Sequence, residues 1–465
     1  KEKHRNKATL WQKVRHSTRT GTPSSRAISW NGYNFTTACT RATCKAARTY
    51  RSNLYAGHKS NTLSPFSPAV IVLELSCPVQ TYHWGKKGQS SLVAQLASQG
   101  GHLSDVDERT TYAELWMGTH PTCPSKVKGT NQTLADWISE HPESLGESVR
   151  GAFGGQLPFL FKVLSVDTAL SIQAHPTKGL AELLHSTRPD KYPDPNHKPE
   201  IAIALTEFDA FCNFRPLQEI TDLIKGLPEL KAILGAEAER PLADKEALQR
   251  CFRKLMTTSP DVFIPMLKKM ADRLRNSANT SVVSKDLANV FLKIYATYPE
   301  DIGCFVVFFL NFIRLRPGEA LFLAANEPHA YVSGNCVECM ACSDNVVRAG
   351  LTPKFKDVDT LCSMLSYDSV PAPDVRFPAT PTDVRCCSFR PPIPDFAVNK
   401  IQVPAGGTYT PKSVPSASIL LVIEGEGKVG TKTAKRGSIL FLVAGKAVTI
   451  SASQAMQIYQ AFSPV

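Results

Sequence analysis

Three things that this 465-residue chain lacks narrow what it can be. No apolar run can cross a bilayer, because the longest, Cys304 to Phe312, is less than half of the ~20 residues that a spanning helix needs. No histidine follows His329, so the end of the chain cannot build a histidine-based metal site. No signal-peptide pattern precedes the 13 scattered cysteines, which favours reduced thiols in a cytoplasmic protein over a disulfide framework.

Acidic residues are almost missing from the first 60 positions, where 13 Lys and Arg face the single acid Glu2. The rest of the chain holds 40 basic and 40 acidic residues, so the net charge of +12 belongs to this leading part. A nucleic-acid partner is therefore not expected. Residues 1–68 are interpreted as a truncated or mistranslated leader, a basic tail without fixed structure, or a transit peptide.

Two strand-rich regions flank a helical one. A helix is expected over 92–99 and strands over 159–165, 201–205 and 320–324. From 216 to 300 apolar residues recur at helical spacing, beginning with Leu217, Ile220, Leu223 and Ile224. Strands are expected to resume at Cys304 and run to Leu315. Because the helical block interrupts two strand-rich parts, it is most simply an insertion.

The stretch Ser171 to Pro176 contains the pattern Gln-x-His. In a strand alternate side chains share one face, so Gln173 and His175 would point the same way, with Ser171 beside them. An amide oxygen and an imidazole side by side are two corners of a metal site. A plain hydrogen-bonded pair is the alternative.

Two other stretches supply matching ligands. Glu200 precedes the apolar strand from Ile201, and His329 follows the strand that ends at Ala324. With Gln173 and His175 they make a nitrogen and oxygen set without sulfur. That set fits zinc with a position left open for water or substrate, and also a harder divalent ion.

Two further features have a functional and a structural interpretation. Lys162 stands inside the apolar strand 159–165, where a charge is costly without a partner, so it either faces the site or reaches solvent at the strand end. Cys339 and Cys342 have the C-x-x-C spacing of redox and zinc sites. No second such pair completes a zinc set, which favours a structural role for these cysteines.

Taken together, the motifs resemble the type I mannose-6-phosphate isomerases (phosphomannose isomerases), from about residue 72 to the C-terminus. Beside the Gln-x-His run and Asn196–Glu200, the stretches that carry the resemblance are Tyr82–Lys86, Ala113–Pro121, Leu157–Leu164, Glu338–Asn345 and Val347–Lys354. The resemblance implies a zinc-dependent aldose–ketose isomerase acting on mannose 6-phosphate and fructose 6-phosphate. Such an enzyme supplies mannose for GDP-mannose and protein glycosylation.

The expected fold is mainly β with an α insertion. A strand, a Pro-Gly turn, a strand and then His329 are typical of a cupin-type double-stranded β-helix, or jelly roll. Glycines between short strands after about 385 predict a second, structural jelly roll. The expected domains are a leader at 1–68, a catalytic cupin domain at 69–215 and 301–375, a helical insertion at 216–300 and the C-terminal jelly roll at 376–465.

The chemistry needs a base for a carbon-bound proton, stabilisation of an enediolate and a grip on the phosphate. One Zn²⁺ per chain, held by Gln173, His175, Glu200 and His329, would act as Lewis acid. The resemblance implies that Arg348 is the active-site arginine. The other pocket positions that it implies are Ser171, Lys162, Lys198, Lys354 and Tyr331.

The roles of four further residues are left open between alternatives. Asp344 and Glu338 are alternative proton carriers, and each could instead be an ion-pair partner of Arg348 or a lysine. His197 is a candidate for opening the sugar ring. Trp84 is expected at the pocket mouth or in the core.

Two other functions remain open. One is a cupin-type sugar-phosphate-binding protein without catalysis. The other is a metal-dependent oxygenase, whose sites commonly use two histidines and one carboxylate. We expect a small-molecule sugar phosphate as the partner of a monomeric, cytoplasmic protein, without membrane or nucleic-acid partners.

Overall fold

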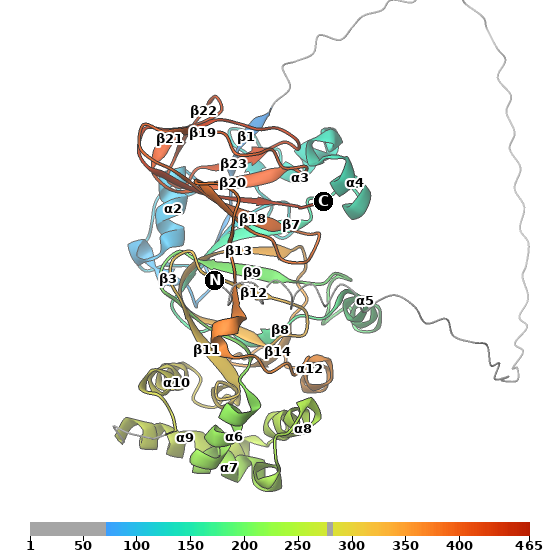
Figure 1. The fold of residues 1–465 in the computed structure, drawn as a ribbon, viewed down its shortest axis with the longest axis vertical. Coiled ribbons are helices and arrows are strands. Elements are labelled where there is room, and N and C mark those ends of the chain that lie inside the picture. The colour runs from blue at the N-terminus through green and yellow to red at the C-terminus, as the bar shows by residue number, and fades with distance from the viewer. Residues whose placement is uncertain (1–70, 277–281) are drawn as a thin grey trace, which may run out of the picture. The chain divides into compact units, whose positions relative to one another are not determined.

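A computed structural model describes residues 71–276 and 282–465 (Figure 1). Leader residues 1–68 lie outside these described residues. Most of the fold is antiparallel sheet, as expected, with a block of helices set apart from the strands (Figure 1). Among the described residues no helix has the length and apolar character to span a membrane. The cysteines in these ranges all carry free thiols.

The long strand β13 (His329–Ala341) organises the barrel that holds the ligand stretches. Its second half pairs with β7 (Phe159–Val166) on one side and β9 (Glu200–Ala204) on the other. Its first half pairs instead with β10 (Phe208–Phe214) and, at His329, with β8 (Ile172–Ala174). The two halves of β13 therefore belong to two different groups of paired strands. A strand that passes from one sheet to another in this way forms a corner of a jelly roll.

The change of sheet occurs at Gly334. Its φ of +111° lies in a region that residues with a side chain rarely adopt, and a Cβ there would lie 2.3 Å from the carbonyl oxygen of Glu207. The glycine thus lets β13 bend against the turn before β10. As a result a single strand carries both Glu338, which lines the cavity of the barrel, and His329, which contacts the cavity residue Glu200.

The helical block joins two paired strands. β10 pairs antiparallel with β11 (Leu310–Leu315), from Phe208 opposite Leu315 to Phe214 opposite Leu310. The helices inserted into this hairpin are α6 (Leu217–Gly226), α7 (Pro228–Leu234), α8 (Lys245–Met256), α9 (Pro260–Asn276) and α10 (Lys285–Thr297). Their apolar faces share one core with the barrel residues Ile172, Phe211 and Val347. The insertion is therefore packed against the strands that carry the site.

One expected strand is wrong in part. Residues Gly303–Val306 form the short helix α11, and the strand begins only at Leu310. The residues from Cys304 to Leu310 are all fully buried. A segment buried on every side has no apolar period, so its sequence cannot separate helix from strand.

The C-terminal residues form a second β-structure. Its large sheet has the order β16-β17-β18-β25-β20-β23-β1-β6, and a smaller sheet has the order β19-β24-β21-β22. The shorter strands of the two sheets are β16 (Thr380–Pro381), β17 (Cys386–Phe389), β19 (Thr408–Tyr409), β24 (Ile450–Ala452), β21 (Glu426–Val429) and β22 (Lys432–Lys435). The bounds of its main strands are β18 (Ala397–Val403), β20 (Ser418–Glu424), β23 (Ile439–Leu442) and β25 (Met456–Phe462). The two neighbours at its edge, β1 (Val72–Ser76) and β6 (Lys126–Val127), come from the beginning of the described chain.

The two β-structures share a hydrophobic core. Leu115 and Phe161 of the first belong to the same buried cluster as Phe441 and Tyr459 of the second. Helix α2 (Leu92–Gly100), predicted at 92–99, contributes Leu96 to this cluster. The predicted strands at 159–165, 201–205 and 320–324 are confirmed as β7, β9 and β12 (Ala320–Leu323).

Candidate active site

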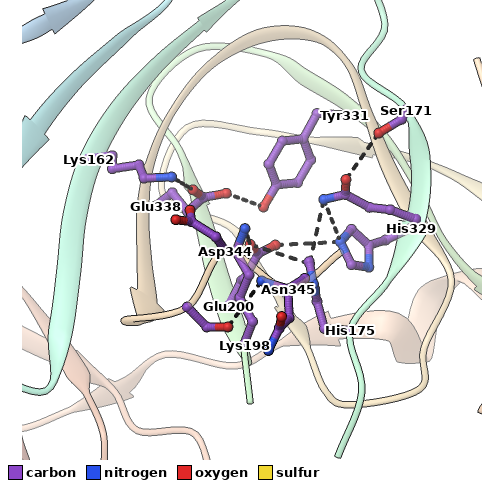
Figure 2. Close-up of polar contacts among 12 residues, drawn as sticks. Lys162, Ser171, His175, Lys198, Glu200, His329, Tyr331, Glu338, Asp344 and Asn345 are labelled. Carbon is purple, nitrogen blue, oxygen red and sulfur yellow. Dashed lines mark hydrogen bonds and ion pairs between the residues drawn. The ribbon is translucent and has the colours of Figure 1, made fainter. Parts of the chain in front are cut away.

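A cavity of about 460 Å³ opens between the sheets of the first barrel. Of the predicted site residues, eleven line it: Trp84, Lys162, Ser171, Gln173, Lys198, Glu200, Tyr331, Glu338, Asp344, Arg348 and Lys354. His175 and His329 stand behind this lining, and both are buried. Segments that lie far apart in the sequence thus converge on one space (Figure 2).

Three of the predicted ligands meet at the floor of the cavity. His175 Nε2 lies 3.5 Å from Glu200 Oε1, and His329 Nε2 lies 3.4 Å from Glu200 Oε2 (Figure 2). Their ligand atoms all lie within 4.8 Å of one another. Each comes from a strand end: His175 follows β8, Glu200 opens β9 and His329 opens β13.

In both imidazoles the Nδ1 proton is used in a hydrogen bond to a backbone carbonyl and does not point to Glu200. His175 Nδ1 donates to the backbone carbonyl of Asn345 at 2.7 Å, and His329 Nδ1 donates to the carbonyl of Glu327 at 3.0 Å. Burial lowers the pKa of His175 to about 4, so the ring is neutral at pH 7. Because Nδ1 is the donor in both rings, Nε2 is the atom that carries the lone pair of a neutral imidazole, and in both residues this atom faces the Glu200 carboxylate.

In this arrangement the hydrogen-bond acceptors on the two histidines face the acceptor oxygens of the Glu200 carboxylate, with no proton between them. Burial opposes the charge on Glu200, but the pKa of this carboxyl is held well below the usual range by the basic groups around it, by His175 and His329 when they are protonated and by the permanently charged Lys198, so the carboxylate is ionised. Glu200 Oε2 is buried and finds no hydrogen-bond donor within the described ranges. A cation between the two Nε2 atoms and the carboxylate satisfies all three groups, so the residues fit a divalent metal ion.

Gln173 lies beside these three groups, on the strand face that its spacing from His175 predicts. Its side-chain amide lies 3.5 Å from Nε2 of His175 and equally far from Nε2 of His329. Ser171 Oγ contacts the other end of the amide at 3.1 Å. A half-turn of the amide group directs Oε1 towards the histidines and Nε2 towards Ser171, whose hydroxyl can accept as well as donate.

A buried charge cluster forms one wall. Lys162 Nζ lies 3.2 Å from Glu338 Oε2 and 3.4 Å from Glu114 Oε2, and 5.0 Å above the Trp116 ring. Tyr331 donates its hydroxyl proton to Glu338 Oε1 at 2.9 Å (Figure 2). Burial raises the pKa of Glu338, and its lysine partner only partly offsets this effect. The predicted lysine facing the cavity is thus held between two carboxylates.

The charges of the cavity are balanced before a metal binds. The cationic side chains in the lining are Lys162, Lys198, Arg348 and Lys354, and the anionic ones are Glu114, Glu200, Glu338 and Asp344. A divalent ion gives this space a net charge of +2, which suits a phosphate dianion. Arg348 of β14 (Val347–Gly350) stands opposite Gln173 in the strand register, and Lys198 Nζ lies 3.7 Å from Glu200 Oε1.

Asp344 stands at a more exposed part of the lining. His120 Nε2 lies 3.5 Å from its Oδ2, and this hydrogen bond lowers the pKa of Asp344. Trp84 also lines the cavity and stacks on Tyr82 with ring centroids 5.9 Å apart. His197 does not belong to the lining: its Nε2 lies 3.1 Å from both carboxylate oxygens of Asp395. The predicted role of His197 in opening the sugar ring stays a prediction.

Sequence reasoning overlooked Glu114, His120 and the carbonyl of Asn345. Glu114 begins the otherwise apolar buried strand β5 (Glu114–Met117), and a lone carboxylate there was a signal of the same kind as Lys162. His120 has no such signal, because its partner Asp344 belongs to a distant part of the sequence. A backbone carbonyl carries no residue identity at all, so its role could not be read from a side-chain pattern.

Comparisons with known proteins match three models of one family along this chain. They are the catalytic domain of type I phosphomannose isomerase at residues 72–217, its helical insertion domain at 228–310 and its C-terminal model at 389–432. A curated relative, the mannose-6-phosphate isomerase of Bos taurus, is 47% identical over 401 residues, which cover 82% of this chain and 95% of the relative. That of Schizosaccharomyces pombe is 42% identical, with 84% and 99% covered.

Solved structures agree with the curated relatives. The apo mannose 6-phosphate isomerase of Salmonella typhimurium superposes with a TM-score of 0.74 at 30% identity, covering 85% of this chain and 99% of the other. A zinc-bound structure of mannose 6-phosphate isomerase has a TM-score of 0.73 at 30% identity, covering 85% and 100%.

Proposed function

Because this chain belongs to the type I phosphomannose isomerase family, we propose that it interconverts mannose 6-phosphate and fructose 6-phosphate by an enediol route. In a cell this reaction supplies mannose for GDP-mannose and protein glycosylation. The observation that carries the proposal is the meeting of two imidazole lone pairs and a buried carboxylate at the floor of a charge-balanced cavity.

The proposed cofactor is one Zn²⁺ per chain, with His175, Glu200, His329 and the amide oxygen of Gln173 as ligands. When bound, the ion would supply a Lewis acid for the carbonyl group of the open sugar. The fixed Nδ1 hydrogen bonds of both histidines hold their rings in the orientation that a ligand needs.

The proton between C1 and C2 is proposed to travel on Glu338. Burial raises the pKa of this carboxyl, and a base is most effective when its pKa approaches the working pH. Tyr331 and Lys162 hold one oxygen each and so fix its position. Asp344 is the alternative carrier, but its pKa is lowered, which makes it the weaker base.

The remaining cations are proposed to bind the anionic parts of the substrate. Among the described residues neither Arg348 nor Lys354 pairs with a carboxylate, although both line the cavity. The register of Arg348 opposite Gln173 supports a position beside the proposed metal site, where the guanidinium would face the negative charge of the enediolate. Lys354 and Ser171 would contact the phosphate and the sugar hydroxyls.

A coupled assay with mannose 6-phosphate, with and without a chelator, tests the function. Turnover that stops on chelation and returns with zinc supports the proposal. Tight binding of the sugar phosphate without turnover would favour an inactive cupin-type binding protein, and oxygen uptake would favour an oxygenase. We further propose a monomer acting in the cytoplasm, for which sedimentation and fluorescence localisation are the measurements.

A further inference from the structure

Asp301 is a nearly buried carboxylate that has no role in the proposed chemistry. Only 9% of its surface is exposed, and it does not line the cavity. It lies between the end of the helical insertion at α10 and the short helix α11. A carboxylate in this environment is costly unless several donors surround it.

Its donors come from the chain segment that lines the cavity. Asp301 Oδ1 accepts from the backbone N–H of Gly303 at 2.7 Å and of Leu351 at 2.8 Å. Oδ2 accepts from the N–H of Thr352 at 3.3 Å and contacts Lys356 Nζ at 3.1 Å. One side chain thus ties the start of α11 to the segment 351–354, every residue of which lines the cavity.

The backbone at this junction is both crowded and strained. A Cβ on Gly350 would lie 2.6 Å from Asp301 Oδ1, and one on Gly303 would lie 2.7 Å from the backbone nitrogen of Leu351. Leu351 itself has a φ of +56°, a left-handed conformation that is unfavourable for a bulky residue. Such a conformation persists only where surrounding contacts impose it, and the hydrogen bond from Leu351 N–H to Asp301 is such a contact.

We infer that Asp301 is a positioning residue, which holds the segment 351–354 in the left-handed turn that presents Lys354 to the phosphate of the substrate. The inference rests on the proposed function of the cavity. Asp301 itself touches neither the substrate nor the metal site. It acts through the backbone of Leu351 and Thr352.

The kinetic signature follows from what the segment binds. The phosphate takes no part in the hydrogen transfer, and contacts that are equally strong in the ground state and the transition state lower KM without raising kcat. Loss of the contacts should therefore raise KM and leave kcat almost unchanged. A role in general folding would instead lower the amount of active enzyme, with KM unaltered in the folded fraction.

The test compares Asp301→Ala and Asp301→Asn with a matched control. For Asp301→Ala we expect the KM for mannose 6-phosphate to rise about 10- to 100-fold and kcat to stay within about threefold. Asp301→Asn keeps an oxygen for Gly303 and Leu351, so its KM should rise less. Glu229→Gln, in α7, removes a buried carboxylate that binds Arg273 at 2.7 and 2.8 Å and should leave KM unchanged.

Inorganic phosphate serves as a second probe. Its inhibition constant against mannose 6-phosphate should rise in Asp301→Asn by the same factor as KM, with the zinc content equal to that of the wild-type protein. An unchanged KM and phosphate inhibition in a folded Asp301→Asn would overturn the inference. So would a fall in kcat without a change in KM. A wild-type protein that does not isomerise the sugar would instead overturn the proposed function.

Discussion

The backbone carbonyl of Asn345 accepts a 2.7 Å hydrogen bond from Nδ1 of His175. It joins a predicted metal ligand to the loop that leads into β14, the strand of Arg348. The orientation of the imidazole is thereby linked to the position of the arginine, and the side-chain amide of Asn345 is in turn held by the carbonyls of Asp194 and Asn196. Metal binding and substrate binding share this support.

Replacement of His175 by alanine should remove the ion and the activity together. Loss of a group that only orients a ligand costs about 10- to 100-fold, so loss of the ligand should exceed about 100-fold in turnover. Metal analysis beside the coupled assay measures both. His185→Ala is the control, because its Nδ1 also meets a backbone carbonyl, that of Tyr192 at 2.8 Å, outside the cavity. If His175→Ala kept its zinc, the ligand assignment would be wrong.

Zinc should stabilise the fold through Glu200. A ligand at about 100 times its dissociation constant adds about 2.7 kcal/mol to the free energy of unfolding. Thermal unfolding of the chelated protein with and without added zinc should therefore show a higher Tm with the metal. The gain should vanish in Glu200→Gln and persist in Glu319→Gln, whose carboxylate pairs with Arg376 at the surface. An equal gain in both variants would place the ion elsewhere.

Lys162→Met should destabilise the protein strongly. It leaves Glu114 and Glu338 buried without their cation, and removal of one partner of a buried pair costs about 3–5 kcal/mol. Urea unfolding measures the change. Lys128→Met breaks the pair with Glu74, in which both side chains are about one-third exposed, and should cost about 1 kcal/mol or less. Similar losses in the two variants would speak against a buried cluster.

The identity of the proton carrier should appear in the pH dependence of kcat/KM. A base acts when ionised, so activity falls as the pH drops through its pKa. Burial places the pKa of Glu338 above its ordinary 4.5, whereas His120 places that of Asp344 below 3.8. We therefore expect an acid limb above pH 4.5 and a loss of about 100-fold or more in Glu338→Gln. A greater loss in Asp344→Asn would transfer the role to that residue.

The site could be predicted from sequence to the extent that it depends on local spacing. Gln173 and His175 share a face because strand side chains alternate, and the structure places the amide of one 3.5 Å from the imidazole of the other. The family, inferred from the motifs, is confirmed by relatives that match most of the chain. The roles assigned to individual residues stay predictions until the variants are measured.

Contacts between segments that lie far apart in the sequence could not be predicted. The place of β1 at the edge of the C-terminal sheet could not be predicted, because nothing in Val72–Ser76 identifies a partner strand near the other end of the sequence. The same holds for Asp301, whose backbone donors Leu351 and Thr352 belong to a segment well beyond it. The α11 helix was missed for another reason, because complete burial removes the apolar period.

The pairing of β1 with β23 has a consequence for biosynthesis. A ribosome releases Val72–Ser76 early, yet Leu442, the register neighbour of Val72, is made close to the end of synthesis. Until then this edge of the nascent chain has no native neighbour, and unpaired edges invite association between chains. A chain that stopped short of Ile439 would therefore leave β1 paired with β6 on one side and without its native neighbour on the other.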